Sequence, residues 1–98
     1  MALLTPKVDA IVFADSVSYG ENGWTGGIAV SPNGSTVYVG DSEANNNDIF
    51  VINTSTDTIT QTVPVGNEAD AVAVSPDGKY VYVANLNTGT VSVIYTGA

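Results

Sequence analysis

The sequence predicts an all-β protein built from two copies of one repeat, each supplying strands for a four-stranded antiparallel sheet. A long motif recurs at a fixed distance, its apolar segments are short and rich in β-branched residues, and Pro, Gly, Asn and Asp bound those segments. Apolar residues do not recur at helical spacing, so a stack of helical repeats is excluded.

The repeat becomes visible when the sequence is aligned with itself. Residues 27–34 (GIAVSPNG) return 44 residues later as residues 71–78 (AVAVSPDG), and the match continues through the next strand. After an Asn-rich loop that is two residues longer in the first copy, residues 49–54 match residues 91–96 at an offset of 42. A period in the low forties with four strands per repeat is typical of a β-propeller blade.

The expected elements follow one another in a regular order along a single two-blade unit, residues 1–98. A blade-closing outer strand at about residues 8–18 comes first, then repeat one at about residues 26–54 and repeat two at about residues 57–96. Pro64 ends an outer strand because proline has no N–H for the ladder. The strands expected in repeat two are residues 58–63, 71–75, 80–84 and 90–95.

This strand order predicts that several copies of the chain complete one ring. The chain opens on the outer strand of a blade whose other strands come from elsewhere, and sharing that strand between copies leaves no exposed sheet edge. Val37 and Val39 lie on one face of a blade and Tyr38 on the other, so an isolated pair of blades exposes hydrophobic surface. Propellers have about 4–8 blades, so we expect a homo-oligomer: a six-bladed trimer first, an eight-bladed tetramer second.

Composition excludes several classes of function. The chain has ten Asp and Glu residues and only two Lys, which gives a formal net charge of −8 and argues against nucleic-acid binding. The chain has no Cys, His or Arg, which removes disulfides, thiolate nucleophiles, imidazole ligands and Ser-His-Asp triads. No apolar run reaches the roughly 20 residues of a membrane helix, so we expect no membrane insertion. The first residues lack the pattern of a signal peptide, so we expect none in this chain.

Candidate binding residues lie in loops that we expect on one rim of the ring. Two of these loops link an outer strand to the next inner strand, at residues 21–26 and 67–70, and the third is the hairpin at residues 41–48. Loops on a rigid scaffold commonly carry binding residues. The candidates are Glu21, Trp24, Asp41, Glu43, Glu68 and Asp70.

Each candidate also has a structural interpretation. The oxygen-rich hairpin could hold Ca²⁺, the one cofactor that we consider, but repeat two has an ordinary hairpin there and the EF-hand pattern is missing. Trp24 is either an anchor for a sugar or peptide or a cap over the blade junction. The acids form a belt that attracts cationic partners, or they serve solubility. No spacing singles out a catalytic pair of carboxylates.

The repeat resembles the YVTN β-propeller family in residues 28–34 with 37–41 (IAVSPNG, VYVGD) and in residues 72–78 with 81–85 (VAVSPDG, VYVAN). That family consists mostly of seven-bladed single chains in surface-layer and exported proteins, related to lactonases and to redox-enzyme subunits. The resemblance implies a non-enzymatic binding or scaffold module, extracellular or at the cell surface, that holds a protein or carbohydrate ligand through its rim loops. A lactonase-like hydrolase, a propeller subunit of a redox enzyme and an engineered or excised two-blade fragment are the alternatives.

Overall fold

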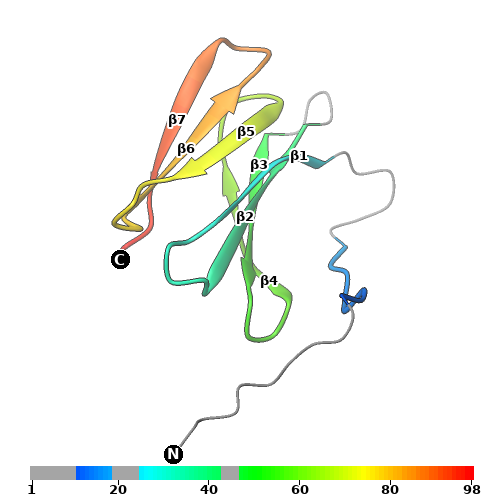
Figure 1. Cartoon of the computed structure of the whole chain (residues 1–98). Helices are drawn as coiled ribbons and strands as arrows, with labels where there is room; N and C mark the ends of the chain where they lie inside the picture. Colours follow the sequence, from blue (N-terminus) through cyan, green and yellow to red (C-terminus); the bar gives the residue numbers. More distant parts are fainter. Residues whose placement is uncertain (1–10, 19–24, 43–46) are drawn as a thin grey trace, which may run out of the picture.

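A computed structural model describes residues 11–18, 25–42 and 47–98, which contain seven β-strands (Figure 1). The strands are β1 (Thr25–Val30), β2 (Thr36–Asp41), β3 (Asp48–Asn53), β4 (Thr58–Pro64), β5 (Ala69–Val74), β6 (Tyr80–Asn85) and β7 (Thr90–Tyr95). The all-β fold class is confirmed. Within the described ranges there is no helix long and apolar enough to cross a membrane.

The strands form two antiparallel sheets. The first sheet has the order β1-β2-β3-β4 and the second has the order β5-β6-β7. Within each sheet, every strand pairs with the next strand along the chain, so both sheets are meanders, as propeller blades are. The strand expected at residues 58–63 of repeat two is β4, which pairs with β3 and is therefore the outer strand of the first sheet.

The second blade has three strands in place of the predicted four, because β4 belongs to the first sheet. The expected blade-closing strand at residues 8–18 falls partly outside the described residues, and residues 11–18 form no strand in this single chain. A strand without a ladder partner leaves its N–H and C=O groups unpaired, and the partner that the sequence predicts for this strand belongs to another copy. Ile11 and Phe13 are accordingly exposed.

One turn type joins the first two strands of both blades. In the second blade, Oδ1 of Asp77 accepts hydrogen bonds from the Ser75 hydroxyl at 2.6 Å and from the Lys79 amide at 3.0 Å. Asn33 accepts the equivalent bonds in the first blade. The glycine that follows has a φ of 76° in both turns, which glycine adopts without steric cost. The Ser-Pro-Asn/Asp-Gly motif therefore specifies this turn twice.

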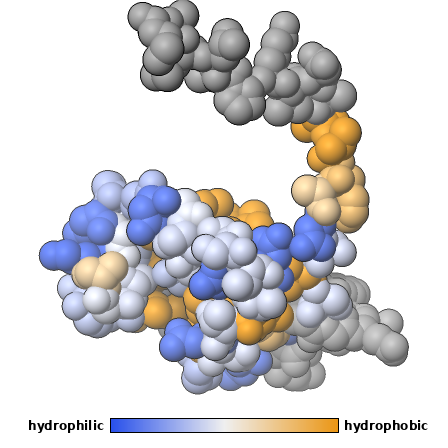
Figure 2. Space-filling model, turned by 90° about the horizontal axis from the view of Figure 1, so that it is seen from below, coloured by the Kyte–Doolittle hydropathy of each residue, from blue (hydrophilic) through white to orange (hydrophobic). Residues whose placement is uncertain are grey.

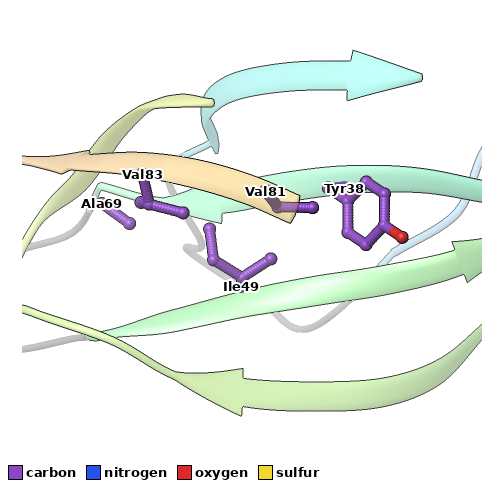
Figure 3. Close-up of a cluster of buried hydrophobic side chains, with 5 residues drawn as sticks. All are labelled: Tyr38, Ile49, Ala69, Val81 and Val83. Atoms are coloured by element: carbon purple, nitrogen blue, oxygen red, sulfur yellow. The ribbon is translucent and has the colours of Figure 1, made fainter. Parts of the chain in front are cut away.

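The hydrophobic core lies between the two sheets and belongs to both of them (Figure 3). Ile49 of β3 and Val81 and Val83 of β6 are completely buried, and Tyr38 and Ala69 complete the cluster. Burying a side chain of this size contributes about 1.5–3 kcal/mol. Each sheet thus covers one apolar face of the other.

Glycines in the first sheet allow its backbone to approach β5 closely. A Cβ atom built on Gly40 would lie 2.7 Å from the carbonyl oxygen of Ala69, and one built on Gly27 would lie 2.6 Å from that of Asp70. Both distances are shorter than a van der Waals contact, so alanine at either position would push the sheets apart.

Candidate functional site

The candidate binding residues that the structure describes lie at one end of the two sheets, which we call the candidate rim. Thr25 at the start of β1 pairs with Asp41 at the end of β2. Ala69 at the start of β5 pairs with Asn85 at the end of β6 in the same way. Because Gly26 lies against Ala69 across the sheet junction, the two sheets present these ends together.

Three of the six predicted site residues can be placed at this rim. Asp41 ends β2 and is only 4% exposed, whereas Asp70 of β5 is exposed and Glu68 is half-buried. Glu68 and Asp70 therefore offer contact surface, while Asp41 adds charge beneath it. Outside the described residues lie Glu21, Trp24 and Glu43.

An irregularity in β5 sets the position of Asp70. The pairing of β5 with β6 skips this residue, so Asp70 has no partner across the ladder. Such bulges bend the strand and re-aim the extra side chain. The first sheet has an irregularity at the same place, where it carries Gly26. Only the second blade therefore presents a carboxylate there.

The backbone around Glu68 is held by both hairpins of the rim. The Leu86 amide donates a hydrogen bond to the carbonyl oxygen of Glu68 at 3.0 Å, and the Val65 amide donates to that of Asn47 at 2.6 Å. Glu68 itself has a φ of 55°, a left-handed conformation uncommon for a residue with a side chain. The segment between β4 and β5 thus bridges the two blades and fixes the backbone that carries this carboxylate.

Two amide side chains that the sequence did not single out lie at the same rim. Asn85 is 2% exposed, and its Nδ2 donates to the hydroxyls of Thr90 at 3.2 Å and Ser92 at 2.8 Å. Its Oδ1 atom and that of Asn67 are buried with no hydrogen-bond partner among the described residues. Leaving a buried acceptor unpaired costs about 1–3 kcal/mol, so both atoms gain from a donor brought to this rim.

The self-alignment provided one indication that Asn85 is buried. In the self-alignment Asn85 occupies the place of Asp41, and both side chains are nearly fully buried. The contact that encloses Asn85 is tertiary, since a Cβ atom built on Gly66 would lie 2.6 Å from its Cγ. No periodic pattern reveals a contact of that kind.

Charge is distributed unevenly between the two ends of the sheets. The opposite end carries Lys79 together with Asp57 and Asp77 in its turns. Among the residues that can be placed, no three acids lie close enough together to hold a metal ion. The candidate rim therefore suits a ligand that brings N–H donors and positive charge. The described acids at the candidate rim are Asp41, Asp48, Glu68 and Asp70.

Among the described residues, the two groups with a shifted pKa lie away from this rim. The Ser75 hydroxyl and the Lys79 amide hold the pKa of Asp77 below its usual value. Burial raises the pKa of the Tyr38 phenol. Asp77 lies in a turn at the opposite end and Tyr38 lies in the core, so neither group contributes an acid or base to the rim.

Comparison with known proteins agrees with this architecture. Among solved structures, hydrazine synthase from Kuenenia stuttgartiensis is similar over 74% of this chain, with 32% sequence identity and a TM-score of 0.68. This chain covers 20% of the length of that one. No curated protein matches the chain. The family model described as "Lactonase, 7-bladed beta-propeller" matches residues 7–97. The chain therefore belongs to the lactonase family of seven-bladed β-propellers.

Proposed function

We propose that this chain is a non-enzymatic binding and scaffold module, a two-blade unit that assembles into a β-propeller and holds its ligand at the candidate rim. The observation that carries the proposal is the chemistry of that rim. Glu68 and Asp70 reach its surface, and the amide oxygens of Asn67 and Asn85 are buried at the same rim with no hydrogen-bond partner among the described residues. All four groups accept hydrogen bonds, and two of them carry negative charge.

The ligand that fits this chemistry best is a cationic segment of another protein. Lysine and arginine side chains bring positive charge and several N–H donors each. A donor that reaches a buried amide oxygen forms a bond worth about 0.5–1.5 kcal/mol net. The formal charge of −8 adds long-range attraction that weakens as salt is raised.

The YVTN resemblance supports a place at the cell surface or outside the cell. The motif occurs in both blades and forms the same turn in each, so the likeness extends over both repeats. On that resemblance we place the module among surface-layer and exported proteins, where a protein neighbour is the first ligand class and a carbohydrate the second.

Calorimetric titration with a deca-lysine peptide tests the rim. Asp70→Asn and Glu68→Gln should each weaken binding about two- to five-fold, because an exposed ion pair contributes up to about 1 kcal/mol. Asp57→Asn removes the same charge at the opposite end and should leave binding unchanged. Equal losses in all three variants would mean that net charge alone drives binding, which contradicts a rim site. A separate titration with CaCl₂ tests calcium as a cofactor of the rim oxygens.

A lactonase-like hydrolase is the second candidate, and the family match over residues 7–97 favours it. Opening a lactone ring releases an acid, so pH-stat titration of the wild-type chain with a six-membered sugar lactone measures this activity. Acid release above the buffer rate that is lost in Asp70→Asn would support an enzymatic rim. Release at the buffer rate alone would leave the binding module as the function.

A further inference from the structure

We propose that the exposed face of the second sheet in one copy docks on the exposed face of the first sheet in the next copy, and that this contact repeats the junction inside the chain. The inference deepens the assembly on which the proposed function rests. Figure 2 shows hydrophobic surface (orange) open to solvent on the body of the molecule. Outer face 1 consists of the exposed Ile28 and Val30, the half-buried Val37 and Ile52, and Val39, which is 6% exposed. Outer face 2 consists of Ala71, Ala73, Tyr82, Ala84, Val91 and Val93.

Outer face 2 is the repeat equivalent of the face that the first sheet buries in the core. Tyr82 aligns with Tyr38, yet Tyr82 is 42% exposed and Tyr38 is 8% exposed. Val91 aligns with Ile49, and their exposed fractions are 63% and 0%. The same positions of one motif are thus covered in one blade and open in the other. Only the first of these two faces has a neighbouring blade.

Outer face 1 is, in turn, the equivalent of the face that the second sheet buries. Ile28 is 65% exposed, whereas the aligned Val72 packs against the core cluster. Val37 aligns with the fully buried Val81 and lines a hollow of about 390 Å³ on this face. Outer face 2 therefore matches outer face 1 in the same way that the inner face of the first sheet matches the inner face of the second. Because each copy carries both outer faces on opposite sides, one copy can dock on the next in a head-to-tail contact.

Val17, in the segment before β1, contacts the hollow on outer face 1. Val63 of β4 packs against the core cluster, which includes Val81 and Val83. Val17, which aligns with Val63, lines the hollow on outer face 1 together with Val37. Val17 of one copy therefore lies on the side of the first sheet where an outer strand for the preceding blade would run, while Ile11 and Phe13 are exposed. That blade is the second sheet of the neighbouring copy, where β7 is the last strand on its side.

The contact between copies must be more open than the junction inside the chain. Gly27 and Gly40 allow the backbone contact with β5, and their equivalents on outer face 2 are Ala71 and Ala84. Each alanine places a methyl group where the internal junction has backbone at less than 3 Å. The partner sheet accordingly lies farther away at this end of outer face 2.

Light scattering behind size-exclusion chromatography tests the proposal with matched variants. Ile28→Lys disables outer face 1 and Val91→Lys disables outer face 2. Both positions are more than 60% exposed, so neither change disturbs the internal core. Leu86→Lys, at 68% exposure in a rim hairpin, is the control. We expect a multi-copy species for wild type and for the control, and a 10.0 kDa monomer for each face variant.

A mixture of the two face variants gives the sharpest result. Each variant retains one intact face, and the two intact faces complement each other, so an equimolar mixture should form a two-copy species that grows no further. A face variant that still pairs with itself would indicate a symmetric contact and overturn the proposal. A monomeric wild type would also overturn it and assign both faces to other blades of a longer chain. Deca-lysine binding by the monomeric variants tests the rim independently, so a failed docking surface and a failed binding function give different results.

Discussion

Truncating Ile49 tests whether the two sheets stabilise each other through their shared core. The side chain is 0% exposed, so the three carbon atoms removed by Ile49→Ala all leave an apolar environment. At about 0.8 kcal/mol for each buried carbon, transfer costs about 2.4 kcal/mol. The cavity left behind raises the loss in free energy of unfolding to about 3–4 kcal/mol. Urea unfolding followed by circular dichroism, with linear extrapolation, measures this loss.

The equivalent position in the second sheet supplies the matched control. Val91 is 63% exposed, so Val91→Ala removes two carbons that are little more than one-third buried, which costs about 0.6 kcal/mol. Both substitutions are measured in an Ile28→Lys background, which keeps the outer faces of different copies apart. A loss below about 1 kcal/mol for Ile49→Ala, or an equal loss for Val91→Ala, would refute the claim that this cluster holds the sheets together.

Three further substitutions probe the backbone and the turns. Gly40→Ala should lower the free energy of unfolding by about 1–3 kcal/mol, because its Cβ atom would lie 2.7 Å from the Ala69 carbonyl oxygen. An unchanged melting temperature would contradict the close approach of the β2 backbone to β5. Asp57→Gly should raise the free energy of unfolding by about 0.5–1 kcal/mol, because Asp57 has a φ of 54°, a left-handed conformation that glycine adopts without strain. The urea midpoint measures this change. A lower midpoint would show that the Asp57 side chain contributes more to stability than the backbone strain removes. Asp77 has a folded pKa below its usual 3.8, owing first to the Ser75 hydroxyl, so its contribution is complete above that value and is lost as pH falls through the folded pKa. Asp77→Asn should therefore flatten the fall in urea midpoint below about pH 4, and an unaltered acid limb would exclude this carboxylate as its source.

The fold was largely predictable because its signals are local. Turn residues and alternating apolar residues lie within a few positions of one another, so the expected strands at 80–84 and 90–95 match β6 and β7 to within a residue. The outer strand at 8–18 was not predictable from local pattern alone. A segment becomes a strand only when a ladder partner is available, and residues 11–18 have no ladder partner among the described residues.

The candidate site was less predictable because it depends on contacts between blades. The alignment indicated where Asp41 and Asp70 would lie, since strand register follows from the repeat. It could not show that Asp41 is buried, or that Gly66 makes room for Asn85. The burial of the Asn85 Oδ1 atom, which has no hydrogen-bond partner among the described residues, depends on tertiary contacts such as the one with Gly66. A sequence pattern does not reveal such contacts.

The two blades show one motif in two environments, and the difference bears on how strongly copies associate. Gly40 faces the other sheet inside the chain, while the aligned Ala84 faces outward. The close backbone contact therefore belongs to the internal junction and not to the repeat as such. Because a contact between copies lacks that close approach and also loses translational freedom on association, it is weaker than the junction between sheets of one chain. Dilution should then separate the copies while each pair of blades is still folded.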